Sequence, residues 1–401
     1  MTLALRAERA AFGLLVLAAF GWPLAHGLKE TCVVLASVAW LISKAVTRTG
    51  PPRLGAMLPV ALWFAVAALS MINSVNVEES LHGLQKIIKV VLLMCVAADV
   101  MTTRRRMEQL IAALMGGAVI ASIDGLAQFI VGKDLIYGHP IGIAVGEIRR
   151  LSGPFTHGND FAVYAVTILP LCLVMALDAA TPRDRWLGWT VTGLLGTALL
   201  LAFSRSGMAG LCISLSVLFL LRGAWQMVAA GSLAAALALL CLPPEMKAWA
   251  AAQGSLFNIM VMPQRPDMWR TALHMIQAHP WIGVGVNTFV LNYAHFKPAG
   301  DEVIAAYAHN QYLHRAAETG LIGLAALLWL LASTGLAWRR IMREADAWTV
   351  RIASGLGCGL ISFLVMGLFE SALQSSRANF GFWVGLGILQ GWALRPPARS
   401  V

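Results

Sequence analysis

Residues 305–323, AYAHNQYLHRAAETGLIGL, place His309 and Asn310 at the start of a helical pattern. Imidazole is the side chain whose ordinary pKa suits proton transfer near neutral pH, and asparagine is a good N-cap for the helix that follows. The long polar stretch before this segment carries Arg265 and Arg270. A base and a group of cations thus precede an apolar run. This combination favours chemistry on a lipid-linked, phosphate-bearing substrate at a membrane surface.

Arg265 lies in MPQRPDMWR, at the start of an amphipathic pattern. Pro266 suits the first turn of a helix, and the free amides of that turn favour a phosphate oxygen beside Arg265. We therefore expect Arg265 to hold phosphate rather than to form an ion pair with Asp267. Arg270 lies further along the pattern. It is a weaker substrate-binding candidate, and we expect it to be solvated or to face lipid headgroups.

Arg205 lies in LAFSRSGMAG, at the boundary between two apolar runs. An arginine at such a boundary often snorkels to the interface. The flanking serines and Gly207 instead indicate a tight turn that leaves the guanidinium at the mouth of a cavity. Because charged groups at the membrane edge are functional candidates by default, we expect Arg205 to act on substrate.

Two pairs of cations are further candidates for substrate binding. Lys86 and Lys89 lie three residues apart and share one face of an apolar helix. Arg149 and Arg150 adjoin one another in the loop before another apolar run. Each pair either guides an anionic substrate or binds lipid headgroups, and the sequence leaves both options open.

The carboxylates allow two arrangements around the histidines. Glu370 and Arg377 flank the last predicted outside turn, so Glu370 either pairs with Arg377 or orients His309. His314 lies four residues before Glu318, where a surface pair is an adequate explanation. The sequence has no paired acidic motif for a divalent metal and no zinc spacing of Cys and His. We therefore expect no metal or other cofactor, so that arginines must neutralise a bound diphosphate.

The elements that position these residues are apolar. The 401-residue chain is 58% hydrophobic and 12% charged, which predicts an all-α polytopic membrane protein. About twelve transmembrane helices are expected, at 11–27, 31–46, 54–73, 84–102, 107–132, 158–178, 186–203, 206–222, 224–242, 320–338, 350–371 and 378–396.

Basic residues indicate the orientation of these spans. With the N-terminus in the cytoplasm, nearly every short inside loop carries an arginine or lysine cluster, and an even number of spans leaves both termini cytoplasmic. The net charge of +10 reflects mainly this bias. It does not imply a nucleic-acid partner.

Two long loops face the outside in this topology, and residues 1–401 form a single integral membrane domain without a separate soluble domain. The loop at 133–157 is expected to be irregular, with turns near Gly138 and Gly153. The loop at 243–319, before the tenth span, is expected to carry amphipathic helices. One of them has a predicted apolar face of Trp269, Ala272, Leu273 and Ile276.

In these motifs the chain resembles the O-antigen ligase family of bacterial inner-membrane proteins, from about residue 145 to 390. His309-Asn310, nine residues, Gly320, two residues and Gly323 is similar to that family's H-N-x9-G-x-x-G pattern. FSRSGMAGL around Arg205 resembles the family's arginine turn. A loop signature is matched by Arg265-x3-Trp269 and His279-Pro280-x2-Gly283-x-Gly285. The element before the sixth span is matched by RRLSGPFTHGND, with Arg150, Gly153, Phe155 and Asn159.

The resemblance implies a GT-C-related fold, that of the metal-independent polyprenol-phosphate glycosyltransferases. It implies periplasmic transfer of a glycan from undecaprenyl diphosphate to lipid A-core, with membrane lipids as the other partners. By the resemblance, Arg205 and Arg265 grip the diphosphate and His309 is the base or orients the acceptor. A single displacement would invert the anomeric carbon.

Three alternatives share some of these features. An O-antigen polymerase or a protein O-oligosaccharyltransferase of the same superfamily would use the same donor and motifs with another acceptor. The compact loop slightly favours the ligase. A lipid-linked glycan transporter is the alternative of another class. Transporters usually carry inverted repeats and broken helices at the midplane, whereas the polar residues here gather at the outer interface, which favours an enzyme.

Overall fold

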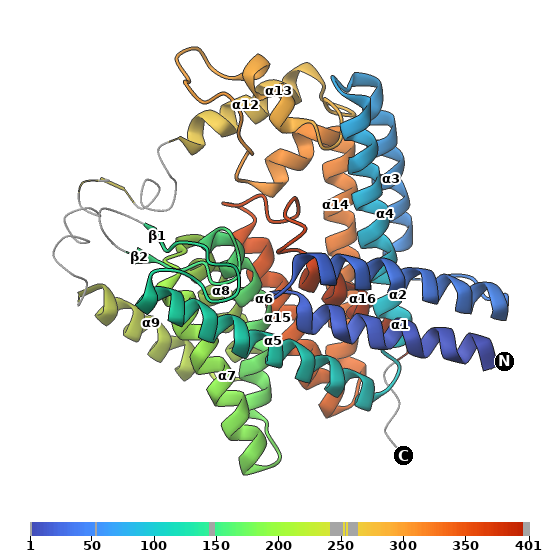
Figure 1. The fold of residues 1–401 in the computed structure, drawn as a ribbon, viewed down its shortest axis with the longest axis vertical. Coiled ribbons are helices and arrows are strands. Elements are labelled where there is room, and N and C mark those ends of the chain that lie inside the picture. Colours follow the sequence, from blue (N-terminus) through green and yellow to red (C-terminus); the bar gives the residue numbers. More distant parts are fainter. Residues whose placement is uncertain are drawn as a thin grey trace.

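The computed structural model describes residues 2–52, 54–143, 149–240, 252, 254–255 and 264–395. Figure 1 shows that this part of the chain is almost entirely helical. In chain order the elements are α1 (Thr2–Gly21), α2 (His26–Thr47), α3 (Met57–Ser70), η1 (Met71–Asn73), α4 (Val77–Val100), α5 (Arg104–Val131), β1 (Gly142–Ile143), β2 (Arg149–Arg150), α6 (Gly158–Leu177), α7 (Pro182–Leu201), α8 (Arg205–Leu221), α9 (Trp225–Leu240), α12 (Arg265–Ala278), α13 (Phe289–Phe296), α14 (Gln311–Glu344), α15 (Ala347–Met366) and α16 (Phe380–Leu394).

Each of the predicted apolar runs overlaps one of these helices. Within the described residues, five helices are long and apolar enough to cross a membrane, namely α2, α5, α6, α14 and α15. The helices α8 and α16, and α3 together with η1, are shorter apolar helices. The prediction of an all-α polytopic membrane protein is therefore confirmed, whereas the count of twelve spans stays a prediction.

The loop at 133–157 contains the one pair of β-strands in the described residues. β1 and β2 pair antiparallel, with Ile143 opposite Arg149. The turns expected near Gly138 and Gly153 are present, since both glycines have positive φ angles, 74° and 53°. Residues 144–148 of this loop lie outside the described residues.

The loop at 243–319 is helical in part, and residues 243–251, 253 and 256–263 of it lie outside the described residues. α12 and α13 lie at one end of the molecule, beside the N-terminal part of α14 (Figure 1). The predicted apolar face of α12 is partly wrong, because Leu273 is 45% exposed whereas Met275 is fully buried. The reason is that α12 packs on α13 and α14, through Ala272, Met275 and Phe289, instead of lying on a flat surface.

Small residues on α15 and α8 bring α6, α8 and α15 close together. A Cβ on Gly359 would lie 2.2 Å from the Thr167 carbonyl oxygen of α6. A Cβ on Gly210 of α8 would lie 2.7 Å from the Ser362 carbonyl oxygen. Close approach through small residues is typical of packing between membrane helices. It sets the N-terminal ends of α6 and α8 beside the segment that follows α15.

α14 is interrupted at Gly320, where φ is 66° and ψ is −177°. The carbonyls of Ala317 and Glu318, released by the break, accept from the amides of Val284 at 2.9 Å and Gly285 at 3.1 Å. The Leu321 amide donates to the Pro280 carbonyl at 2.8 Å. The segment with Gly283 and Gly285 is thus hydrogen-bonded to the segment around Gly320. These bonds fix the start of α14 against the loop after α12.

We expect Gly320→Ala to destabilise the protein by about 2–4 kcal/mol, because this φ and ψ combination is almost restricted to glycine. The added Cβ would also lie 2.2 Å from the Trp281 carbonyl. Thermal unfolding in detergent measures the effect. Gly335→Ala is the matched control in the same helix, since nothing lies within 4 Å of its Cβ position, and it should not lower the melting temperature. Equal melting temperatures for the two variants would contradict this account of the break.

Candidate functional site

Glu370 is the centre of a buried polar cluster just beyond the end of α15. Its Oε1 lies 2.6 Å from Arg265 Nη2 and accepts from Asn159 Nδ2 at 2.5 Å. Its Oε2 lies 3.1 Å from His309 Nδ1. Of the two arrangements left open by the sequence, the structure therefore has the one in which Glu370 orients His309. Arg377 instead donates to Thr156 Oγ1 at 3.3 Å, so a Glu370–Arg377 pair is wrong.

The backbone around His309 is held by α15. The Gln311 amide donates to the Gly367 carbonyl at 2.8 Å, and the Tyr312 hydroxyl donates to the Leu364 carbonyl at 3.0 Å. Asn310 caps α14, since its side chain accepts from the Tyr312 and Leu313 amides. His309 itself has a φ of 45°. An uncommon conformation kept at a polar cluster points to a functional constraint.

The contact between His309 and Glu370 fixes the form of the imidazole. An ionised carboxylate only accepts hydrogen bonds, so His309 Nδ1 carries the proton that lies toward Glu370. Nε2 of a neutral ring is then the acceptor, which is the form that a general base needs. The side chain of His309 is 36% exposed, against 10% for Glu370, so a substrate can reach the ring.

Arg265 begins α12 and lies within the cluster, not on the surface. Only 5% of it is exposed, and its Nη1 donates to the Phe369 carbonyl. Arg270, one turn further on, is 64% exposed and pairs with Asp267 at 2.8 Å. The structure thus brings Arg265 to Glu370 and leaves Arg270 outside, as the amphipathic pattern indicated.

Arg150 and Arg205 approach the cluster from the opposite side. Arg150 donates through Nε to the Ala202 carbonyl at 2.8 Å and through Nη2 to Asn159 Oδ1. Ser204 donates to the same Asn159 oxygen at 3.2 Å and caps α8, whose first residue is Arg205. Arg149 precedes Arg150 in β2, and since alternate strand residues face opposite ways, it is exposed and donates to the Phe129 carbonyl at 3.4 Å.

The charges of this cluster act on one another. Burial alone would raise the pKa of Glu370, but the hydrogen bond and charge of His309 and the charge of Arg265 hold it below its ordinary value. Burial lowers the pKa of Arg150; Glu370 opposes this shift, and the like charges of Arg205 and Arg265 add to it. One guanidinium group, that of Arg265, thus contacts the ionised carboxylate, and those of Arg150 and Arg205 lie near enough for the charges to act on one another. The excess of positive charge suits an anion that carries more than one negative charge.

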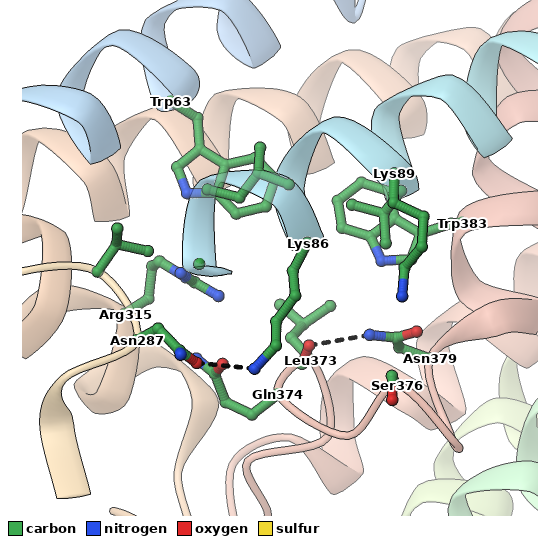
Figure 2. Close-up of a pocket in the computed structure, with 14 residues that line it drawn as sticks. Trp63, Lys86, Lys89, Asn287, Arg315, Leu373, Gln374, Ser376, Asn379 and Trp383 are labelled. Atoms are coloured by element: carbon green, nitrogen blue, oxygen red, sulfur yellow. Dashed lines mark hydrogen bonds between the residues drawn. The ribbon is translucent and has the colours of Figure 1, made fainter. Parts of the chain in front are cut away.

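Several candidates lie elsewhere. Lys86 and Lys89 line a separate pocket of α3, α4 and the segment before α16 (Figure 2). His314 pairs with Glu318 at 3.2 Å, and with exposures of 1% and 2% this is not the expected surface pair. The pair is buried because the His314 ring stacks on Phe289 of α13, with ring centroids 4.6 Å apart. The sequence did not predict the position of α13.

Asn159 is the residue of this cluster that sequence reasoning did not select for the site, although it stood in one of the quoted motifs. Its side-chain amide joins Arg150 to Glu370. Its position in the first turn of a helix after a glycine-rich loop is the sequence feature that could have identified it as a site residue. Within the described residues, no group of three or more His, Cys, Asp or Glu side chains is placed to hold a metal.

Comparison with known proteins gives a family match and a similar structure. Residues 190–328 match the O-antigen ligase family, a segment that contains Arg205, Arg265 and His309. A search of curated proteins finds no match. A chain from a solved structure titled "Structural coordination of polymerization and crosslinking by a peptidoglycan synthase complex" is similar, with 15% identity and a TM-score of 0.49. The similarity covers 84% of this chain and 96% of that one.

Proposed function

We propose that this chain, whose family match supports membership of the O-antigen ligase/polymerase superfamily, is the ligase that completes lipopolysaccharide. It moves a glycan from undecaprenyl diphosphate to lipid A-core. The observation that carries the proposal is the meeting of Arg150, Arg205 and Arg265 with the His309–Glu370 pair. Such a site supplies both charge for a leaving diphosphate and a base for an acceptor hydroxyl.

The arginines act on the donor. As the bond from the anomeric carbon to the diphosphate oxygen breaks, its electron pair and the negative charge pass to the diphosphate. Guanidinium groups fixed before the reaction stabilise that charge without reorganising. Arg265 is held by Glu370 and the Phe369 carbonyl, and Arg150 by Asn159 and the Ala202 carbonyl, so both are preorganised.

His309 acts on the acceptor. Its Nε2 takes the proton of the acceptor hydroxyl while that oxygen forms a bond to the anomeric carbon. Glu370 holds the ring and stabilises the imidazolium that forms. One displacement inverts the anomeric configuration, because the acceptor oxygen attacks the face opposite the departing diphosphate. In this proposal Glu370, which contacts Arg265 and His309, orients the base and is not a nucleophile.

We place the protein in the bacterial inner membrane with the site facing the periplasm and both termini in the cytoplasm. The support is the basic-residue bias of the loops and the position of the cluster. Asn159, Arg205 and His309 each lie at or just before the N-terminal end of an apolar helix, and Glu370 follows the C-terminal end of another.

The test is transfer in vitro by purified protein in detergent, with chelator and without added metal. The donor is undecaprenyl-diphosphate-linked glycan and the acceptor is lipid A-core. We expect a glycan-bearing lipid A-core product with an inverted linkage. Lengthening of the donor glycan instead would identify a polymerase, and transfer to protein would identify an oligosaccharyltransferase. If no product forms while the donor crosses a liposome bilayer, the protein is a transporter and the proposal is wrong.

A further inference from the structure

A second polar pocket lies beside the Glu370 cluster and shares with it the segment between α15 and α16. Figure 2 shows Trp63 of α3, Lys86 and Lys89 of α4, and Arg315 of α14 around it. Gln374 and Asn379 close it from the segment that also carries Glu370. The Gln374 amide donates to Glu318 at 3.3 Å. The segment at 370–379 thus joins this pocket to the proposed reaction site.

The lining of this pocket is positively charged. Its residues, all in the described part of the chain, include Lys86, Lys89 and Arg315 but no carboxylate. Lys89 pairs with Glu30, and Arg315 lies 3.6 Å from Glu318; both carboxylates lie outside the lining. Lys86 donates to the Asn287 amide oxygen at 2.9 Å, a neutral acceptor. The charge of Lys86 is thus compensated by a carboxamide only, which favours an anionic ligand.

Three buried donors of this lining have no acceptor. Trp63 Nε1, Trp383 Nε1 and Arg315 Nε are buried without a hydrogen-bond partner in the described structure. A buried donor left unpaired costs about 1–3 kcal/mol, so an acceptor brought to this lining would be favourable. The two indole rings are parallel within 5°, with centroids 5.8 Å apart, and Arg315 lies 5.1 Å over the Trp63 ring. The two rings cover each other and form the buried floor of the pocket, so the groups that the pocket offers to a ligand are mainly its lysines.

We propose that this pocket binds an anionic sugar of the acceptor, one that carries a phosphate or a carboxylate. The inference rests on the proposed function, in which two substrates meet at Glu370. The negative charge of the donor lies on its diphosphate, which in this proposal is bound by the arginine cluster. A second cationic pocket next to that cluster therefore matches negative charge that the other substrate brings. His309 lies two residues before α14 and Arg315 lies in the second turn of that helix, so the base and the pocket adjoin the start of the same helix.

The test is a binding titration with no donor present, so that it reads the pocket whether or not transfer occurs. The probe is a deacylated, phosphorylated core oligosaccharide, compared with the same oligosaccharide after removal of its phosphates. Protein in phosphatidylcholine nanodiscs is titrated by calorimetry. We expect at least tenfold tighter binding of the phosphorylated form. Lys86→Gln should weaken that binding about five- to tenfold and leave the weak binding of the dephosphorylated form unchanged.

Arg340→Gln is the matched control, because Arg340 is an exposed cation near the far end of α14 that pairs with Glu344. It should bind both oligosaccharides like wild type. Equal affinity of wild type for the two forms would overturn the proposal, as would a Lys86→Gln affinity equal to that of wild type. If nanodiscs with phosphatidylglycerol abolish the binding, the pocket is a lipid-headgroup site and the proposal is also wrong.

Discussion

Replacing Arg265 with alanine is expected to lower the rate of glycan transfer by about 10³-fold or more. Guanidinium groups that stabilise charge on a departing phosphate contribute about 10³–10⁵ in rate. Arg265 is 5% exposed, and both of its terminal nitrogens are held by the segment at 369–370. Because the group is already fixed, its whole effect should fall on the transition state, so kcat should fall far more than the KM for the donor rises. Initial rates at varied donor concentration measure this split.

The alanine change also leaves Glu370 buried without its closest cation, which costs about 3–5 kcal/mol when a buried pair loses one partner. Arg265→Lys is therefore the second variant. It keeps the charge but loses one of the two contacts, and we expect a stable protein that is about 10–100-fold slower. Arg270→Ala is the matched control from the same helix, because Arg270 is 64% exposed, and it should stay within threefold of wild type. Wild-type rates for Arg265→Lys and Arg265→Ala would exclude a role for this group in transfer.

The helices were predictable because apolar run length is a local property. The same holds for the caps, since Asn310 caps α14 as its position before a helical pattern indicated. The face of α12 was not predictable, because burial of Met275 and exposure of Leu273 depend on where α13 and α14 lie. A periodic pattern reports an apolar side but not the shape of its partner.

The members of the site were more predictable than their partners. Arg205, Arg265 and His309 were selected because they lie at helix starts next to apolar runs. The partner of Glu370 was left open between Arg377 and His309, because the choice depends on how residues 61 positions apart meet in space. The partner of Lys29 also depends on the tertiary structure, because a lysine near a membrane surface would ordinarily be expected to contact lipid headgroups. It is buried and donates to the Ser376 carbonyl.

Replacing Glu370 with glutamine is expected to lower kcat by about 10³–10⁴-fold at neutral pH. The glutamine oxygen can accept from Arg265 and Asn159, which places its amide NH₂ toward His309. An amide donor there requires an acceptor at Nδ1, so the proton moves to Nε2 and the ring can no longer take a proton from the acceptor hydroxyl. The corresponding change in a serine-protease triad costs about 10⁴ through the wrong tautomer. Glu344→Gln is the control, since Glu344 is 63% exposed at the end of α14, and it should keep the wild-type rate.

The same substitution should remove a pH dependence of stability. The folded pKa of Glu370 lies below its ordinary value of 4.5, so the folded protein releases this proton more readily than the unfolded chain. Its contribution to stability is therefore fully present above pH 4.5 and is lost as the pH falls through the lower folded value. Melting temperatures from pH 7 down to pH 3 should show wild type well above Glu370→Gln at pH 7 and the two converging in acid. A constant difference across that range, or a glutamine variant that transfers glycan at the wild-type rate, would mean that Glu370 is not the ionised residue that orients His309.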